Sequence, residues 1–592
     1  MSGEVKTYLI NDERINVESE VEIAVKNSIQ SGIVQKYQQS SLSSSSVMYN
    51  INVPSENTLV SKNIQIDAVM WFRVTLDAAM AAAFLASRQA DEPMQIVPNA
   101  FPLNSLISSA SMTINNCSVS VSTQDIKERL LRNYSPECLA KACPDCAYLP
   151  DFNFAETDLM FDTAVANNQG SAVTTGIACQ KNNIVGRGAS RIQFYLQKAG
   201  AAVSAAVETK DGIYPGNAEL NDIFLVKITT REPLLGMPGL EMVEDGSFVG
   251  VNNIELNLQL NDGKNCLTIA RKDGTSPVFY DAVSGATLFQ LGNSSDGVCI
   301  QDDTKAVMKY YSLPPSEYAK MNTKNIVNYN EHVSYKTIVQ NAFTDATLEV
   351  QSNMIQLRQI PDKIYVCVEP TYSSRNATFS SGVTFPITNL NVTLNNRSNL
   401  LSEYNELDMY EMTKRNGSKQ GWNEFNGLIH SIGGLQRCGM GPVIILDPVR
   451  DLQLDTYLSS GSIGAFNLQV KVKCAELRGM KTAKTLNAKN MQVQLNIIAD
   501  YGGVLITQQG SSVAMSGLLT KVLVLETKEK STAVGDYDEV DAMSGGAHPG
   551  ITKVGQVLRK KGKDALVSYA KKQDKTGGMN PGYNVSGGSF YS

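Results

Sequence analysis

The chain has 592 residues, of which 42 % are hydrophobic and 19 % charged, and its formal net charge at pH 7 is −6. This apolar content is too high for general disorder, and a chain this long can bury a large core without disulfides. The longest uncharged apolar run, residues 78–86, is far shorter than the ~20 residues that span a bilayer, and the N-terminus has no apolar secretory core, so we expect neither a membrane protein nor a secreted one.

Residues 1–50 are polar and are predicted to form an N-terminal arm. Apolar residues recur at helical spacing over residues 17–29, which predicts a short helix there. The serine cluster at residues 40–46 is typical of a flexible or extended segment.

Beyond the arm, the pattern changes to that of β-strands. Residues 254–260 alternate strictly between apolar and polar side chains, as in a strand with one face in a core. Clusters of Asn, Ser, Gly and Pro separate such segments, as turns require. The chain is therefore predicted to be mostly antiparallel β, with further strands at residues 64–76, 364–368, 466–472 and 493–498.

The sequence also contains a weak internal duplication. A Phe-Pro pair followed by a strand that ends in Asn-Asn occurs twice, and each copy runs into a predicted helix. Three displacements in the same order are nearly equal, which indicates two related units rather than chance. The displaced pairs are Ile64 and Ile355 (291 residues), Phe101 and Phe385 (284), and Thr113 and Thr393 (280).

The two helices that follow the repeat are predicted from their N-cap residues. Thr123 precedes the first helix, over residues 124–133, and Ser402 precedes the second, over residues 403–415.

A fourth pair gives the size of an insertion in the first copy. Gly246 and Gly461 are displaced by only 215 residues, so the first copy carries 280 − 215 = 65 extra residues. We expect them within residues 135–191, which are rich in Pro, Asn, Gly and Ala.

These patterns predict an all-β protein with two tandem eight-stranded jelly-roll sandwiches, long loop insertions and short helices. The first jelly roll is expected over residues 51–325 and the second over residues 326–532, with a flexible basic tail over 533–592. Two similar modules in one chain suit assembly into rings and lattices, because closed symmetry requires repeated, self-compatible interfaces.

Catalytic motifs are scarce. The chain has three histidines and lacks the His-Glu-x-x-His, phosphate-loop and Gly-x-Ser-x-Gly motifs. His430 lies in a glycine-rich segment without a serine or cysteine motif, so a structural role is favoured. Trp71 and Trp422 are interpreted as core anchors rather than sugar platforms.

We expect that the protein is not an enzyme. The alternatives are a glycan-processing hydrolase, which would need a cleft with paired carboxylates, and a minor virion or adhesin protein.

The ten cysteines are spread thinly and do not form a disulfide framework, so reduced thiols are expected. One group, Cys138, Cys143 and Cys146, places three thiols within nine residues. These thiols form a weak candidate zinc site, with Cys117 or Cys179 as the fourth ligand. Structural or free thiols remain the favoured interpretation, and no metal or other cofactor is expected.

Charge is distributed unevenly along the chain. Residues 545–592 contain eight basic and two acidic side chains, a charge of +6, so the first 544 residues carry −12. An amphipathic basic stretch in this tail could contact packaged DNA, an internal membrane or a partner protein, or remain a solvated tail. Its candidate contact residues are Arg559, Lys560, Lys561 and Lys563.

Residues 50–60, followed by Phe101–Asn104 and Thr113–Asn116 with the helix after them, resemble the entry into the first domain of a known family. In this order they are similar to the double jelly-roll major capsid proteins of polinton-like viruses, virophages and their relatives. The total length and the tandem duplication fit as well, and the resemblance covers about residues 45–530.

The resemblance implies a structural subunit of the icosahedral capsid of a DNA virus. Both sandwiches would stand upright in the shell, and three subunits would form a pseudo-hexagonal capsomer. Inserted loops at residues 135–191 and 261–303 would build outward towers. The implied partners are two further copies of the chain, neighbouring capsomers, and penton or minor capsid proteins. The implied location is the virion, after synthesis in the host cell without a secretory signal.

A further match concerns the start of the tail. Met543, Gly545, Gly546 and Ala547, in the sequence Met-Ser-Gly-Gly-Ala, resemble the site cut by adenovirus-type maturation proteases, which some relatives of the family encode. The match lies where the acidic body gives way to the basic tail. The resemblance therefore implies a possible maturation protease as a partner, although Gly-Gly is also common in flexible linkers.

Overall fold

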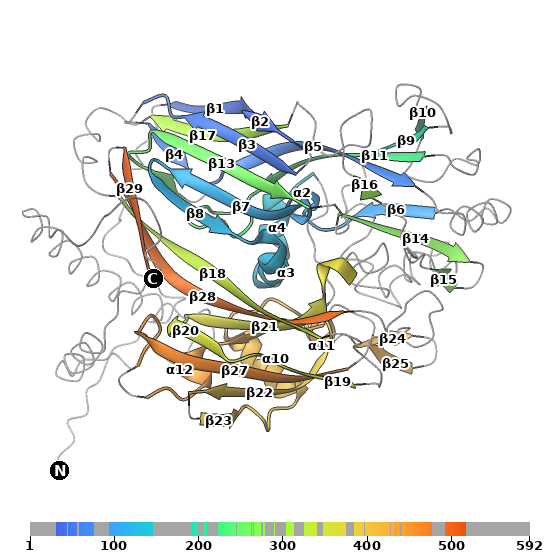
Figure 1. Cartoon of the computed structure of the whole chain (residues 1–592). Coiled ribbons are helices and arrows are strands. Elements are labelled where there is room, and N and C mark those ends of the chain that lie inside the picture. The colour runs from blue at the N-terminus through green and yellow to red at the C-terminus, as the bar shows by residue number, and fades with distance from the viewer. Residues whose placement is uncertain are drawn as a thin grey trace, which may run out of the picture.

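The computed structural model describes residues 31–516 with gaps, the longest at 76–93, 146–191, 210–222, 291–303, 313–324 and 476–491. It shows two β-sandwich modules stacked one above the other, with helices between them and at the side of the lower one (Figure 1). The predicted helix at 17–29 and the tail lie outside the described residues. The fold is mostly antiparallel β, as expected.

The first module has two main sheets. In sheet 1A the central strands are ordered β1–β17–β5–β11, with shorter strands at its ends and edges. Its strands are β1 (Ser31–Gln38), β4 (Leu59–Ser61), β5 (Gln65–Thr75), β9 (Ile192–Gln197), β10 (Val207–Thr209), β11 (Ile223–Pro233), β12 (Ser247–Phe248), β16 (Phe289–Gln290) and β17 (Lys305–Ser312).

Sheet 1B is ordered β2–β3–β13–β7–β8, and a small third sheet, β15–β14–β6, lies at one end of the module (Figure 1). The strands are β2 (Ser41–Leu42), β3 (Ser46–Asn52), β6 (Met94–Pro98), β7 (Ile107–Ile114), β8 (Cys117–Val121), β13 (Asn253–Leu260), β14 (Leu267–Asp273) and β15 (Ser276–Val278). Part of the predicted loop 261–303 is thus strand.

The second module repeats this arrangement. Sheet 2A is ordered β18–β28–β21–β26, with β29 beside β28, and sheet 2B is ordered β19–β27–β22–β23, with β20 also beside β27. A hairpin, β24–β25, extends from one end. The strands are β18 (Asn325–Val339), β19 (Thr347–Gln351), β20 (Ile355–Gln359), β21 (Lys363–Pro370), β22 (Ile387–Leu394), β23 (Arg397–Leu400), β24 (Leu428–Ser431), β25 (Gly434–Arg437), β26 (Ile444–Leu446), β27 (Ile463–Ala475), β28 (Val493–Gln508) and β29 (Ser511–Ser516).

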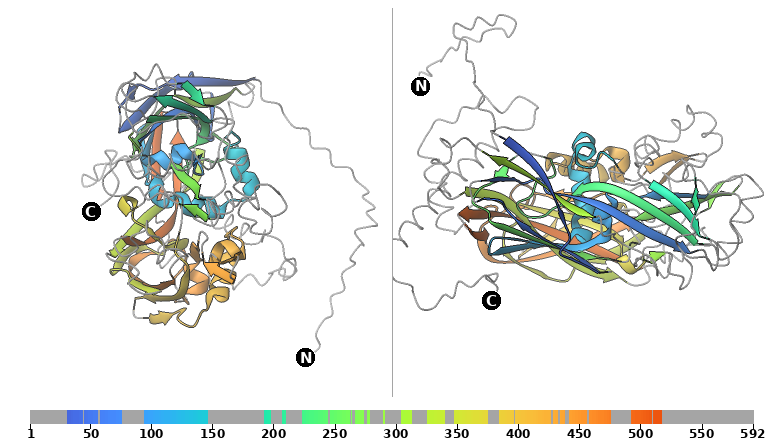
Figure 2. Two further views of the ribbon diagram at one scale, coloured as in Figure 1. Left: turned by 90° about the vertical axis from the view of Figure 1, so that its right-hand side faces the viewer. Right: turned by 90° about the horizontal axis from the view of Figure 1, so that it is seen from above.

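The helices are short. Those of the first module are α2 (Pro102–Leu106), α3 (Thr123–Asn133) and α4 (Pro136–Ala142), and those of the second are α10 (Glu406–Arg415), α11 (Trp422–Asn426), α12 (Pro448–Asp451) and the 3-10 turn η3 (Tyr372–Ser374). In two further views, the cyan helices of the first module and the orange helices of the second project on the same side of the molecule (Figure 2).

The duplication is confirmed in the strands that follow the two Phe-Pro pairs, β7 and β22. β7 and β22 alternate buried and half-buried side chains in the same order, and each pairs with the long strand of its sheet, β13 or β27. Met112 pairs with Leu256, and Val392 pairs with Val470, so the displacements are 280 and 214 residues. The insertion between these strands is therefore 66 residues, close to the 65 expected.

One of the predicted matches is wrong. The segment at Ile355 forms β20 in sheet 2B, whereas the segment after Ile64 forms β5 in sheet 1A. The counterpart of β5 is β21, because each lies next to the last long strand of its sheet, β17 or β28. Alternating aliphatic residues mark a strand with one buried face but do not specify its sheet.

The predicted N-terminal arm is too long. β1 pairs along its whole length with β17, and β3 pairs with β13, so residues from Ser31 onward belong to the first sandwich. Val47, Tyr49 and Ile51 of β3 are buried in its core. The described residues of the serine cluster lie in the hairpin between β2 and β3, where the Ser43 amide donates to the Ser46 carbonyl at 2.9 Å.

The helix starts also differ from the prediction. Ser122, not Thr123, is the N-cap of α3, and its hydroxyl donates to Asp125. Asn405, not Ser402, is the N-cap of α10, because its side chain and that of Asp408 form a capping box.

The core consists of two clusters of buried apolar side chains. The second cluster lies within the second module. The first fills the first module but also includes residues of the second, among them Tyr365, Ile445, Ile498 and Leu505. The two modules therefore share buried surface, and side chains of sheet 2A that face away from their own core pack against the first module.

Candidate functional site

Helix α3 lies between the two modules (Figure 1) and carries four buried charged side chains. Its residues Lys127, Glu128, Arg129 and Arg132 are each less than 8 % exposed. Charged groups are seldom buried this far unless they are paired, so their partners indicate what this junction does.

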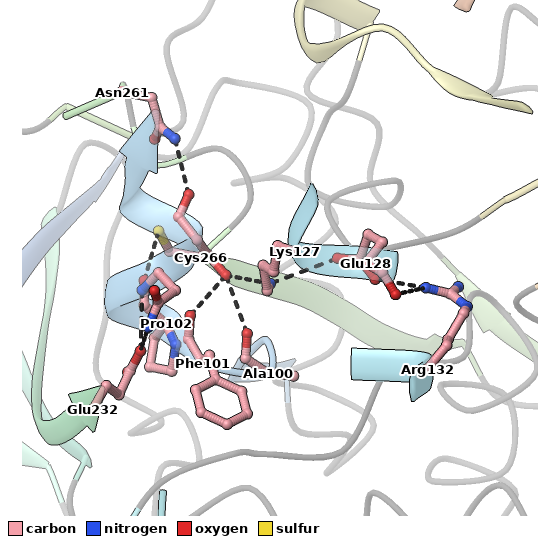
Figure 3. A network of polar contacts seen from close by, with 11 residues as sticks. Ala100, Phe101, Pro102, Lys127, Glu128, Arg132, Glu232, Asn261 and Cys266 are labelled. Atoms are coloured by element: carbon pink, nitrogen blue, oxygen red, sulfur yellow. Dashed lines mark hydrogen bonds and ion pairs between the residues drawn. The ribbon is translucent and has the colours of Figure 1, made fainter. Parts of the chain in front are cut away.

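Helix α2 is anchored to the first module by Glu232, the carboxylate of which receives four hydrogen bonds (Figure 3). The backbone amides of Leu103 and Asn104 donate at 2.9 and 3.0 Å, the Asn104 side chain at 2.8 Å and the Thr230 hydroxyl at 3.1 Å. Burial raises the pKa of Glu232, while these donors oppose that rise. The carboxylate supplies the N-terminal cap that α2 lacks in its own sequence.

Helix α3 is tied to α2 by a second set of contacts in the same view (Figure 3). Lys127 Nζ donates to the Ser105 hydroxyl at 2.5 Å, and that hydroxyl donates to the carbonyl oxygens of Ala100 and Phe101. Glu128 lies between two cations, 3.7 Å from Lys127 Nζ and 3.0 Å from Arg132 Nη1. The helix is therefore held rigidly on its own module.

The opposite side of α3 reaches the second module through Arg129. Its guanidinium lies 3.4 Å from Asp500 Oδ2 on β28 and 3.1 Å from His332 Nε2 on β18. His332 Nδ1 lies 2.7 Å from Asp500 Oδ1, so the three side chains form one buried cluster. The guanidinium also lies over the ring of Tyr365, 4.4 Å from its centroid.

The pKa values in this cluster follow from burial and charge. Burial and the nearby Arg129 lower the pKa of His332, although Asp500 and Glu331 oppose this. Burial tends to raise the pKa of Asp500, but the His332 hydrogen bond and the charges of His332, Arg129 and Lys363 outweigh it and lower the pKa. Above its lowered pKa the imidazole of His332 is neutral and can accept at Nε2 from Arg129, and its charge acts on Asp500 only at lower pH.

Contacts on both sides of the cluster extend the junction. Lys336 of β18 pairs with Asp125 at 2.5 Å, and Asn496 donates to the Asp125 carbonyl at 3.2 Å. Asn133, at the end of α3, donates to the Tyr365 hydroxyl at 3.2 Å. The helix thus contacts the outer face of sheet 2A at both of its ends.

A second junction lies at the turn between β7 and β8. Asn115 adopts a left-handed conformation (φ 55°); its side chain accepts from the Asn252 amide and donates to Ser512, while Asn116 accepts from the Ser512 amide. Strand β29 of the second module therefore reaches back to the edge of sheet 1B. The counterpart turn at Asn395 (φ 53°) repeats the bond to the facing strand, in which Asn467 is the donor.

This arrangement is that of a structural joint. The ionisable groups at its centre bind one another across the modules, which fixes the orientation of one sandwich on the other. Among the residues that the structure describes, no group of three His, Cys, Asp or Glu side chains is placed to hold a metal ion.

The structure describes two of the three predicted zinc ligands, Cys138 and Cys143. Cys143 is buried, with its sulfur 3.7 Å from the Thr230 hydroxyl, and Cys138 is half-buried on α4. Cys146 and Cys179 lie outside the described residues, as do the predicted cleavage site and the tail contact residues.

The predicted histidine and tryptophans are placed as follows. His430 lies in β24 of the small hairpin. Trp71 lies half-buried in β5 on the face opposite the core, where Lys227 Nζ lies 5.5 Å from its ring centroid, so it is not the core anchor that was predicted. Trp422 is 37 % exposed on α11, so it is not the buried anchor that was predicted. Its aromatic neighbours, Tyr410 and Phe425, hold it at the surface.

Sequence reasoning missed Arg129, His332 and Asp500. The separations from Arg129 to the other two are 203 and 371 residues, so no local spacing could link them. The one available signal was a charged side chain on the apolar face of a predicted helix.

Comparisons with known proteins agree with this architecture. Residues 3–295 match the model of the first domain of the Sputnik virophage major capsid protein, and residues 332–503 match that of the major capsid protein V20 C-terminal domain. A putative capsid protein V20 of Sputnik virophage is 23 % identical over 529 residues, which cover 86 % of this chain and 79 % of the relative.

Two solved structures share the fold over most of the chain. A chain of the Sputnik virophage cryo-EM structure has a TM-score of 0.64 at 19 % identity and covers 93 % of this chain and 98 % of its own. The mavirus major capsid protein has a TM-score of 0.60 at 15 % identity, with 89 % and 98 % covered. No helix in the described part of the chain is long and apolar enough to cross a membrane.

Two jelly rolls in tandem are the fold of the double jelly-roll capsid proteins. Within that class, the chain belongs with the major capsid proteins of virophages, to which it is homologous in both domains. It is therefore a structural component of the virion and not an enzyme.

Proposed function

We propose that three copies of this chain form a pseudo-hexagonal capsomer, and that such capsomers build an icosahedral shell together with penton or minor capsid proteins. The observation that carries this proposal is the duplication of sheets 1A and 1B as sheets 2A and 2B. Three chains with two similar modules each present six similar units around one axis. Subunits related by a rotation close into a ring when a whole number of such rotations makes one full turn.

Light scattering on the purified full chain tests the oligomeric state. We expect a mass of three times 64.3 kDa. A monomer that persists at high protein concentration would contradict the proposal. Negative-stain images of purified particles should show hundreds of copies in the shell, whereas a minor protein would be present in few.

The basic tail is proposed to contact packaged DNA or an internal membrane through Arg559, Lys560, Lys561 and Lys563. The support is electrostatic: residues 545–592 carry +6, against −12 for the rest of the chain. A chain that ends at residue 544 should lose salt-sensitive binding to DNA or to anionic vesicles and keep its oligomeric state. Equal binding by the shortened chain would contradict this role.

Cleavage by a maturation protease between residues 543 and 547 is proposed on the match of Met543, Gly545, Gly546 and Ala547 to such sites. Intact-mass spectrometry of the protein from mature particles tests it directly. A C-terminus within this segment is expected, and full-length chains in infectious particles would refute it.

A further inference from the structure

Helices α3 and α10 occupy equivalent places in the two modules. Each follows the last strand of its B sheet, β8 or β23, and precedes a strand of its A sheet, β11 beside β5 or β26 beside β21. α3 is covered by the outer face of sheet 2A, the face that points away from the core of the second module. No described segment of the chain covers the outward side of α10 in the same way.

The uncovered side of α10 and α11 has an apolar centre. Leu407 is 51 % exposed and Trp422 37 % exposed, and Tyr410 lies between the two helices with its ring 5.2 Å from that of Trp422. Aromatic side chains held rigidly at a surface are the residues that most often dominate protein interfaces. We call this surface the helix face.

The helix face is acidic. It carries Glu403, Glu406, Glu411 and Glu424, against Lys414, while Arg415 is already paired with Asp451 at 2.8 Å. An acidic, partly aromatic face fits a basic partner surface.

The outer face of sheet 1A has this character. Residues of β5 that point to the core are buried, so Asp67 and its cross-strand neighbours point outward. By register, the charged residues on this face whose side chains the structure describes are Lys36, Asp67, Lys227, Arg231, Lys305 and Lys309, a formal charge of 5 − 1 = +4. Val34 of β1, on the same face, is 60 % exposed. We call this surface the sheet face.

We propose that the helix face of one copy docks on the sheet face of a second copy, and so repeats between chains the contact that α3 makes with sheet 2A within the chain. This inference rests on the proposed capsomer and assigns its contacts. The central strands β1, β17, β5 and β11 of sheet 1A correspond to β18, β28, β21 and β26 of sheet 2A, so the face that receives a helix within the chain has its counterpart on sheet 1A. Because the two faces differ, the contact is head-to-tail and can close a ring.

The charges also determine which helix docks on which sheet. α3 presents Arg129 to the carboxylate of Asp500, whereas the sheet face offers mainly cations. Arg129 would be repelled there, and α3 is already covered by sheet 2A of its own chain, so the order of modules around the ring alternates.

Two variants test the docking by complementation. The helix-face variant carries Leu407→Asp and Glu411→Lys, and the sheet-face variant carries Val34→Asp and Lys305→Glu. Light scattering should show that each alone has lost the trimer. An equimolar mixture should form a complex of twice 64.3 kDa, because one intact helix face then meets one intact sheet face.

The matched control carries Met354→Asp and Glu255→Lys, at exposed positions away from both faces, and should remain a trimer. Circular dichroism should show all variants folded. Trimers formed by either docking variant, or a mixture that stays monomeric, would overturn the proposed docking contact. A wild-type trimer in the same experiment would still support the proposed capsomer. A wild-type chain that never forms a trimer would overturn both.

Discussion

Arg129 is the residue through which the first module recognises the second. Its side chain projects from α3, is only 4 % exposed and contacts both Asp500 and His332. The Asp500 side chain is 5 % exposed. Removing one partner of a buried ion pair leaves the other charge uncompensated, and this costs more than the pair itself contributes.

We therefore expect Arg129→Met to lower the free energy of unfolding by about 3 kcal/mol, measured by urea denaturation. Arg397→Met provides the matched control, because the pair of Arg397 with Asp455 is almost half exposed and should cost less than about 1 kcal/mol. Adding Asp500→Asn to Arg129→Met should recover part of the loss. A loss no larger than that of the control would contradict the proposed role.

The same cluster predicts a dependence of stability on pH. The pKa of His332 is lowered from 6.5 in the folded state, so the unfolded chain binds a proton first as the pH falls. The contribution of His332 to the free energy of unfolding is therefore fully present above pH 6.5. It is lost as the pH falls from 6.5 to the folded pKa, by about 1.4 kcal/mol for each pH unit between the two pKa values. The lowered pKa of Asp500 adds a second loss below 3.8.

The urea midpoint of the wild type should therefore fall between pH 7 and pH 5, and that of His332→Gln should fall less. Between pH 8 and pH 7 neither should change through this residue. An identical pH profile in both proteins would show that His332 does not titrate differently in the folded state.

At the scale of elements, the two modules use one turn for two purposes. Asn115 and Asn395 end equivalent strands in the same left-handed conformation, and each accepts a hydrogen bond from the facing strand. The Asn115 side chain alone also donates to Gly250 and to Ser512 of the second module. The first turn is thus both a strand end and an inter-module contact.

Alanine at either turn should strain the backbone by about 1–2 kcal/mol, because alanine disfavours positive φ. Asn115→Ala should cost about 1–2 kcal/mol more than Asn395→Ala, since it also breaks the two extra hydrogen bonds. Urea denaturation of both variants measures the difference. Equal losses would mean that the contact with Ser512 adds nothing to stability.

At the scale of the molecule, the modules share a core. Neighbouring residues of β28 point to opposite sides: Ile497 belongs to the core of the second module, and Ile498 to the cluster that fills the first. Both are 1 % exposed. The two sandwiches should consequently unfold in one transition.

Ile497→Ala and Ile498→Ala should each lower the free energy of unfolding by about 2–4 kcal/mol. Hydrogen exchange should separate them: Ile498→Ala should speed exchange in α3 of the first module, and Ile497→Ala should leave it little changed. Two separate thermal transitions in the wild type would contradict the shared core.

The sequence by itself predicted five of the strands, the duplication and the size of the insertion, because alternation of apolar residues and the order Phe-Pro, strand, Asn-Asn are local and recur at nearly equal displacements. It also determined the class of protein. It misplaced β20, since alternation identifies a buried face and not a sheet, and it missed β1, the polar side chains of which lie at the edge of sheet 1A.

Only the tertiary structure decided how the modules are joined. Arg129, His332 and Asp500 meet across 203 and 371 residues, and Trp422 turned out to be exposed rather than buried. The physical reason is that burial of a charge or of an aromatic ring depends on which surface is placed against it. That surface comes from a distant part of the chain or, for the helix face, from a second copy.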